Sequence, residues 1–166
     1  MRTKIALGAI VAVILVLVTA GITAASATSK STTNTTSTPA TKVIDLTARA
    51  LQGGDVDEPP KGPSVADYFV FSETLTRRSD GRRVGESGGN CQVTRLGANQ
   101  EPAALHCVAT LRLRQGQITV QGLITESGPT FYVAITGGTG AYQTAHGQMR
   151  VIRRGDVARY TVYVIL

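Results

Sequence analysis

The sequence is poor in the residue types that most metal, nucleotide and nucleophile sites require. It has no tryptophan, two cysteines and two histidines among its 166 residues. No cluster of histidine, cysteine and acidic residues has metal-ligand spacing. No phosphate-binding glycine loop precedes a helix, and no G-x-S-x-G elbow occurs. These absences exclude the common motifs for metals, nucleotides and serine hydrolases, and we expect no cofactor.

Basic residues exceed acidic ones, 17 to 11, but they do not gather in one element. Four arginines flank the turn Ser79-Asp80-Gly81, and no aromatic stacking platform lies beside them. We interpret this segment as a solvated hairpin tip and predict no nucleic-acid partner. An anionic surface, such as cell-wall polymer or lipid headgroups, stays open as a partner for the tip. The four arginines are Arg77, Arg78, Arg82 and Arg83.

The first 27 residues have the pattern of an export signal. Arg2 and Lys4 give a positive start, residues 5–18 are an apolar run, and Ala25-Ser26-Ala27 has the A-x-A form of a cleavage site. The pattern predicts removal of residues 1–27 and a secreted, extracellular protein. The alternative is a retained membrane anchor, because residues 5–22 approach the roughly 18 residues that span a bilayer. The domain would then be membrane-anchored and extracytoplasmic.

A polar segment follows the predicted signal. Residues 28–41 are nearly all serine and threonine, and they have no apolar face whose burial could offset the entropy of ordering. We predict a disordered spacer here. We predict that residues 42–166 form one domain.

Alternation with period two recurs through this domain, and glycine, proline, asparagine and aspartate interrupt it. Short connections make neighbouring strands antiparallel, apart from a long loop predicted at residues 52–65. The pattern predicts an all-β domain, an eight-stranded antiparallel β-barrel, with a two-sheet sandwich as the competing architecture. The expected strands are 42–51, 67–76, 84–96, 103–114, 117–124, 130–136, 142–153 and 158–166.

The alternation also predicts which side chains face the interior. The inward faces are mostly aliphatic, with small residues among large ones, which suits a filled core or an apolar cavity. A small hydrophobic ligand or substrate is the partner that such a cavity would take. The predicted ligand-binding residues are Phe69, Phe71, Val93, Leu105, Ala109, Ile118, Val120 and Ile124.

Cys91 and Cys107 are the two cysteines, and in an exported domain two cysteines usually pair. A hairpin centred on Asn99 places positions 91 and 107 directly opposite each other, because each lies eight residues from the centre. Opposed residues have Cβ atoms close enough for a disulfide. We therefore predict a bond between them.

Four segments resemble known sequences. VGESGGNC at 84–91 looks like the strand of plant allene oxide cyclases that carries Gly-x-x-x-Gly-x-Cys, and GQITVQG at 116–122 resembles their G-H-L/I-S-V-Q-G. AITGGTG at 134–140, followed by Gly147-Gln148, is similar both to those cyclases and to plant dirigent proteins. YTVYV at 160–164 fits the last strand of both. The chain is identified as resembling this barrel superfamily.

The resemblance implies an eight-stranded barrel with an apolar central cavity, usually assembled as a homotrimer. It implies an activity in which the barrel orients a reactive substrate, either cyclising a fatty-acid epoxide or steering radical coupling. The cavity cysteine of the cyclases falls on Cys91 and a pocket aromatic on Phe71. Glu73 stands where the cyclases have asparagine, and Asp45 falls near their first-strand glutamate.

Glu73 and Asp45 are accordingly the predicted catalytic residues. Glu73 shares the face of Phe69 and Phe71, so an inward carboxylate could donate or accept a proton. The alternative places Glu73 at the barrel mouth, solvated beside Arg77. We predict a barrel that binds a small apolar molecule and directs its stereoselective cyclisation or coupling. A carrier without chemistry, or a structural cell-envelope protein with a filled barrel, are the alternatives.

Overall fold

A computed structural model of the chain describes residues 40–98, 102–125 and 127–166, which belong to the unit Ser37–Leu166. The predicted signal, residues 1–27, and the predicted spacer up to residue 39 lie outside the described residues. The elements are β1 (Thr41–Val56), β2 (Tyr68–Arg77), β3 (Arg83–Arg95), β4 (Ala104–Leu113), β5 (Gly116–Thr125), β6 (Thr130–Gly138), a 3-10 turn η1 (Gly140–Tyr142), β7 (His146–Arg154) and β8 (Val157–Ile165).

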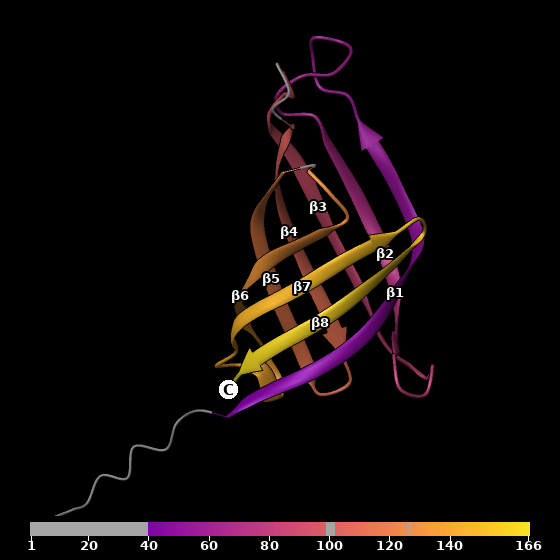
Figure 1. Cartoon of the computed structure of the whole chain (residues 1–166), viewed down its shortest axis with the longest axis vertical. Helices are drawn as coiled ribbons and strands as arrows, with labels where there is room; N and C mark the ends of the chain where they lie inside the picture. Colours follow the sequence, from indigo (N-terminus) through magenta and orange to yellow (C-terminus); the bar gives the residue numbers. More distant parts are fainter. Residues whose placement is uncertain (1–39, 99–101, 126) are drawn as a thin grey trace, which may run out of the picture. The chain divides into compact units, whose positions relative to one another are not determined.

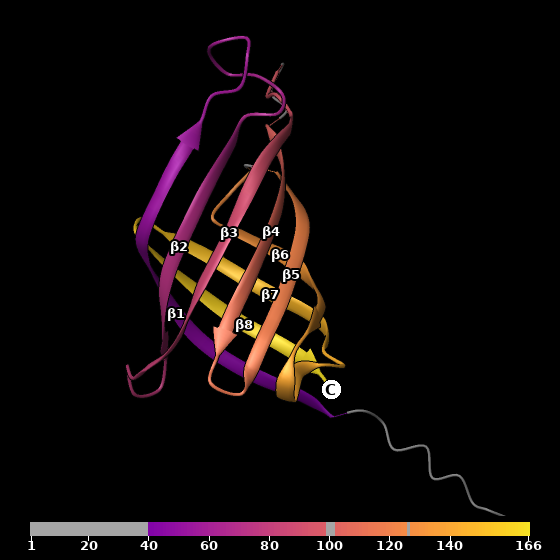
Figure 2. The ribbon, with the colours of Figure 1, turned by 180° about the vertical axis from the view of Figure 1, so that it is seen from behind.

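The eight strands form a closed antiparallel barrel in chain order (Figure 1). β1 closes it, because its first part, from Thr41 to Arg49, pairs with β8 while the part from Leu46 to Val56 pairs with β2. Figure 2 shows the other side, where β2 to β5 run side by side. The barrel prediction is confirmed, and the sandwich alternative is wrong. Within the described residues, no helix is both long and apolar enough to span a bilayer.

Two segments differ from the predicted strands. Gln52–Val56 was predicted as loop, but it continues β1, with Gly53 opposite Phe71 on β2. Residues 142–145 were predicted as strand, but β7 begins at His146 because a 3-10 turn precedes it. Gly140 allows this turn because it has no Cβ. Its φ is +61°, and an added Cβ would lie 2.5 Å from the Gln115 carbonyl oxygen. The turn places Tyr142, which is buried, across the end of the barrel.

The lower half of the barrel, where the β2–β3 and β4–β5 hairpins turn, is filled. The six largest side chains that are less than 2% exposed lie there, and we call them the packed layer. Full burial of such a side chain contributes about 1.5–3 kcal/mol, so the layer supplies a large share of the hydrophobic stabilisation. The packed layer consists of Leu46, Leu75, Leu111, Ile118, Val162 and Val164.

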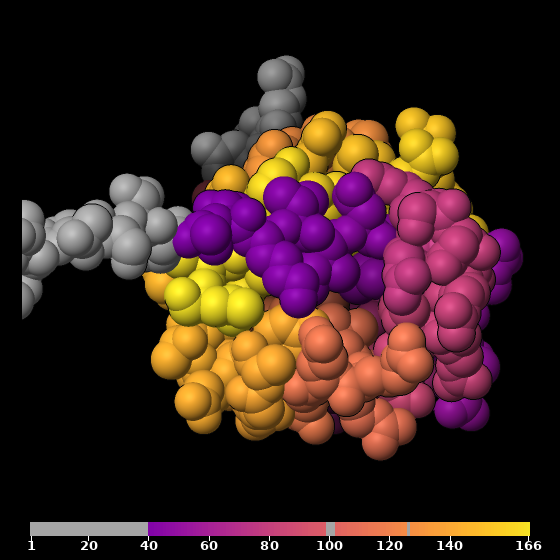
Figure 3. All heavy atoms as spheres, turned by 90° about the horizontal axis from the view of Figure 1, so that it is seen from below, coloured from indigo at the N-terminus to yellow at the C-terminus, as the bar shows by residue number. Residues whose placement is uncertain are grey.

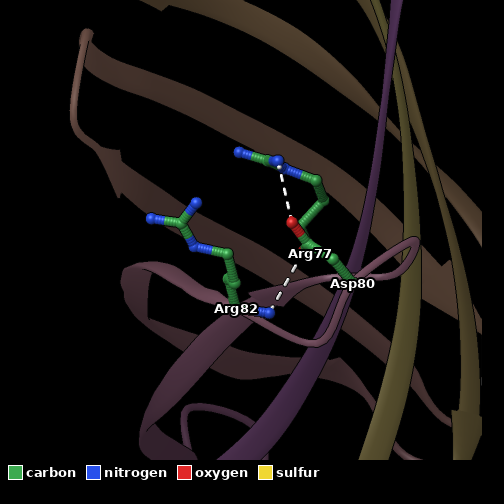
Figure 4. A network of polar contacts seen from close by, with 3 residues as sticks. All are labelled: Arg77, Asp80 and Arg82. Atoms are coloured by element: carbon green, nitrogen blue, oxygen red, sulfur yellow. Dashed lines mark hydrogen bonds and ion pairs between the residues drawn. The ribbon is translucent and has the colours of Figure 1, made fainter.

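The β2–β3 tip carries the four arginines noted above, and acidic residues pair with most of them. Arg77 Nη1 lies 3.0 Å from Asp80 Oδ2, and the Arg82 backbone N–H donates to Asp80 Oδ1 at 3.1 Å (Figure 4). Arg78 pairs with Asp45 on β1. Exposed pairs of this kind contribute little stability, but they offset the positive charge of the tip.

Candidate functional site

A cavity of about 220 Å³ occupies the upper half of the barrel, above the packed layer. Side chains from β2 to β8 line it, and most of them are apolar. Six of the predicted ligand-binding residues are among them: Phe69, Phe71, Leu105, Ala109, Val120 and Ile124. The barrel therefore combines a filled lower half with an open upper half, and the size of the cavity suits a small molecule.

Aromatic rings form two walls of the cavity. On β2, the ring centroids of Phe69 and Phe71 lie 6.1 Å apart with an interplanar angle of 39°. On β6, Phe131 also lines the cavity, and the Arg153 guanidinium lies 5.5 Å from its ring centroid. Flat aromatic faces favour flat, apolar ligands, because stacked rings gain contact area and quadrupole attraction together.

Glu73 is a carboxylate within this apolar lining. Among the described residues, Glu73 and Arg153 are the charged side chains that line the cavity. Ser87 Oγ and Tyr160 Oη each donate a hydrogen bond of 2.6 Å to the same atom, Glu73 Oε2. No described residue donates a hydrogen bond to Oε1. The carboxylate is thus fixed through one oxygen while the other stays available to a ligand.

The register explains how these three side chains meet. Ser87 is the direct partner of Glu73 on β3. Tyr160 lies on β8, so its phenol reaches Glu73 past β1. On β1, Ala48 pairs with Leu75 on one side and Ala158 on the other, and its side chain is buried and small. A longer residue at position 48 would fill the space through which Tyr160 reaches.

Burial raises the pKa of the Tyr160 phenol, and the nearby Glu73 carboxylate raises it further. Tyr160 therefore keeps its proton at neutral pH and acts as a hydrogen-bond donor. Ser87 is also buried, and its hydroxyl donates to Glu73. This pair of donors can hold a negatively charged oxygen in one position without a counter-cation.

The two cysteines form a disulfide, as predicted, and they are direct register partners on β3 and β4. Both line the cavity. A bonded sulfur has no free thiol, so Cys91 differs from the cavity cysteine that the resemblance implied. The disulfide instead supplies a polarizable piece of apolar wall beside β2, where Cys91 is the register partner of Phe69.

Three predicted site residues do not line the cavity. Ile118 faces inward but belongs to the packed layer. Val93 faces a separate depression of about 370 Å³ near the barrel mouth, beneath the β1–β2 loop. Asp45 alternates with the inward Ile44 and Leu46, so it lies on the outer face, where it pairs with Arg78 and accepts a hydrogen bond of 3.0 Å from Thr161.

The loop between β1 and β2 is held at the barrel mouth by Asp67. Its carboxylate accepts hydrogen bonds from the backbone N–H (2.7 Å) and hydroxyl (2.8 Å) of Ser64, and from the Glu58 backbone N–H at 3.0 Å. The hydrogen bonds from Ser64 lower the pKa of Asp67. The Ala66 backbone N–H donates to the Val93 carbonyl at 2.9 Å, which attaches the loop to β3.

Sequence reasoning missed Phe131, Arg153 and Tyr160 as cavity residues, and it missed Ser87 as a hydrogen-bond partner of Glu73. Alternation was the available signal, since Phe131-x-Val133 and Val151-x-Arg153 repeat the inward pattern of β2. No group of three or more histidine, cysteine or acidic side chains within the described ranges could hold a metal ion.

Comparisons with known proteins agree with this geometry. The family model described as "Allene oxide cyclase barrel like domain" matches residues 27–166. No curated protein sequence matches the chain.

Solved structures give closer detail on the fold. A pyocyanin demethylase is 29% identical, with a TM-score of 0.65 over 74% of this chain and 99% of its own. An exo-specific intermolecular Diels-Alderase is 13% identical, with a TM-score of 0.64 over 77% of this chain and 98% of its own. A pterocarpan synthase dirigent protein is 19% identical, with a TM-score of 0.59 over 75% and 84%. The last two likenesses show the fold alone.

Proposed function

Because the chain belongs to the family of allene oxide cyclase barrel-like domains, we propose that its cavity binds a small, flat, mostly apolar molecule and directs its stereoselective cyclisation or coupling. Glu73 is the group that takes part in the chemistry. The observation that carries this proposal is the placement of one fixed carboxylate, with one uncommitted oxygen, among aromatic and aliphatic walls.

Orientation is the first contribution of the cavity. Phe69, Phe71 and Phe131 hold the faces of a bound molecule, and the narrow space restricts its conformations before reaction. Holding reacting atoms in a near-attack geometry removes a large part of the entropic barrier. The apolar walls also keep water from a reactive intermediate.

Glu73 is the second contribution. Its Oε1 can accept a proton from a bound ligand, or stabilise positive charge that develops during ring closure. Tyr160 and Ser87 hold Oε2 and so position the carboxylate; Tyr160 remains protonated and is not the base. Groups that a ligand presents to Oε1 are therefore hydrogen-bond donors or electron-deficient carbons.

The similar structures support a small organic substrate without fixing the reaction. Their printed names include a demethylase acting on pyocyanin, a Diels-Alderase and a dirigent protein. The first is also the most similar in sequence of these three, so pyocyanin, a planar aromatic molecule, is the first ligand to test. A carrier without chemistry is the competing function, since it needs the walls but not the acid.

We further propose export and extracellular function. The sequence pattern of residues 1–27 supports export, and a disulfide persists best in an oxidising compartment. The homotrimer expected from the resemblance is part of the same proposal.

Binding and turnover measured on matched variants test the function. We expect binding to the wild-type chain to change the absorbance spectrum of pyocyanin. Phe71→Ala should weaken pyocyanin binding about 3- to 10-fold. Glu73→Gln should keep binding within about twofold and slow turnover of a true substrate about 10²- to 10⁴-fold. Glu86→Gln, which removes an acid from the outer face of β3, is the control.

Candidate substrates come from the products of biosynthetic genes beside this one, with product chirality as the readout. Equal rate and product ratio in wild type and Glu73→Gln, with binding lost in Phe71→Ala, would establish a carrier. Release of a methyl group from pyocyanin would identify demethylation instead. No binding of any flat apolar ligand would favour a structural function for the barrel.

A further inference from the structure

A second pocket lies at the opposite end of the barrel from the cavity. It measures about 440 Å³ and is lined by residues of β1, β2, β3, the β4–β5 turn and η1. Figure 3 looks onto this end, where indigo β1, the pink β2–β3 tip and the salmon β4–β5 turn meet. The packed layer separates this lower pocket from the cavity, so a ligand in one does not touch a ligand in the other.

The floor of the lower pocket is apolar. Ile44 and Leu46 from β1, Val84 from β3, and Leu113 from β4 contribute aliphatic surface, and Tyr142 of η1 adds an aromatic ring. Leu46 and Tyr142 are buried, whereas the other three are partly exposed. The pocket volume of about 440 Å³ is large enough to receive a short hydrocarbon chain or one ring.

The rim of the lower pocket is cationic. Lys42 and Arg77 occupy inward positions, because they continue the series Lys42-x-Ile44-x-Leu46 on β1 and Glu73-x-Leu75-x-Arg77 on β2. Arg114 follows β4 and completes the rim. No acidic side chain lines the pocket among the described residues. Inward cations at the end of an otherwise apolar face are what an anion-binding rim requires.

Two of these cations have no acidic partner. Arg77 pairs with Asp80 at 3.0 Å (Figure 4). Within the described part of the chain, no carboxylate lies within ion-pair distance of Lys42 or Arg114, and the Lys42 ammonium lies 5.7 Å from the Tyr142 ring centroid. The nearby acids Asp45 and Glu86 are held on the outer face by Arg78 and Arg112.

We propose that the lower pocket binds a small amphiphilic carboxylate in free form, such as a medium-chain fatty acid. The carboxylate would lie between Lys42 and Arg114, and the apolar tail would cover Leu113, Val84 and the edge of Tyr142. The two oxygens of one carboxylate can accept hydrogen bonds from the two cations that lack an acidic partner, and an apolar tail matches the floor; a bare inorganic anion would leave the floor exposed to water. This inference does not depend on the proposed function of the cavity.

Isothermal titration of the full chain with sodium decanoate, below its micellar concentration, tests the proposal. We expect Lys42→Gln/Arg114→Gln to weaken decanoate binding roughly tenfold and added salt to weaken it in the wild type. The matched control is Arg49→Gln/Arg159→Gln, which removes two exposed arginines from the outer faces of β1 and β8. The control should bind within about twofold of the wild type.

Three further measurements separate the alternatives. Decanol, which has the same tail without the charge, should bind the wild type and the Lys42→Gln/Arg114→Gln variant equally. Ala109→Phe, which fills the upper cavity, should leave decanoate binding unchanged. The proposal is overturned by loss of decanoate binding in Ala109→Phe, by no binding to the wild type, or by binding to phosphatidylglycerol vesicles without binding of free decanoate.

Discussion

The phenol of Tyr160 donates a hydrogen bond of 2.6 Å to Glu73 Oε2 across β1, the strand that lies between β8 and β2. This contact joins residues 87 positions apart. It forms because the barrel closes through β1 and because the inward residue of β1 at this place, Ala48, is small. The acid of the cavity is therefore held by the closure of the barrel itself.

Tyr160→Phe should destabilise the barrel by about 1.5 kcal/mol, the low end for hydrogen bonds to charged groups, because Glu73 is half-buried. Ser87→Ala removes the second donor to the same oxygen. Since both donors share one acceptor, we expect the double variant to differ from the sum of the single changes. Urea unfolding of the wild type, the two single variants and the double variant measures this difference. Strict additivity of the two changes in unfolding free energy would contradict a shared acceptor.

Stability should fall at alkaline pH. The folded-state pKa of Tyr160 lies above the unfolded value, so above pH about 10 the unfolded phenol loses its proton while the folded one keeps it. The stabilisation that comes from protonated Tyr160 is complete below pH about 10. Above that pH, the free energy of unfolding drops by about 1.4 kcal/mol per pH unit for this group. Urea midpoints between pH 8 and 11 should show a shallower loss in Tyr160→Phe, and identical slopes would refute the assignment.

The β1–β2 loop should loosen in acid. Hydrogen bonds from Ser64 lower the folded-state pKa of Asp67 below 3.8, so this support is present above that pH and is lost as the pH falls through the folded value. Asp67→Asn should speed amide exchange of Glu58 and Ser64 at pH 6 without changing exchange in β5. Unchanged protection of Glu58 and Ser64 would show that the loop has other supports.

The disulfide should resist alkylation until it is reduced. Its loop closes 16 residues, and loss of the bond in Cys91→Ser/Cys107→Ser should cost about 3 kcal/mol in the chain-entropy model. Mass spectrometry after alkylation, with and without reductant, counts the free thiols. Labelled thiols on the unreduced protein would contradict the bond and return Cys91 to the role of a pocket thiol.

Assembly as a trimer predicts an apolar contact surface. Tyr163, Ile165 and Ile152, at outward positions of β7 and β8, are half-buried within the chain. Leu123 on β5 and Tyr132 on β6 are 66% and 53% exposed, and they lie on outer faces of neighbouring strands. Leu123→Lys should dissociate the trimer, so that light scattering gives the mass of a monomer. A monomeric wild type would contradict the prediction.

Alternation predicted the strands and most inward faces correctly. The face that a side chain occupies follows from the residues two places away on the same strand. The disulfide followed from counting along one hairpin. The level of a residue along the barrel axis could not be predicted in that way. Ile118 has the correct face, but strand tilt and stagger place it in the packed layer, and Val93 lies toward the mouth for the same reason.

Contacts between distant strands were also beyond local patterns. Tyr160 could be assigned an inward face, but its meeting with Glu73 depends on barrel closure and on the size of Ala48. The sequence left Glu73 either in the cavity or solvated at the mouth beside Arg77. In the structure it lines the cavity, because Arg77 lies two inward positions further along β2, beyond Leu75 of the packed layer.

The division between the packed layer and the cavity affects how such a protein can change during evolution. Substitutions at lining positions such as Ala109 or Val133 alter the shape of the upper space while the six fully buried side chains below keep their contacts. Substitutions that alter ligand preference therefore leave the contacts of the packed layer in place. The shape of the ligand space can therefore change through single substitutions in the upper half while the packed layer continues to support the fold.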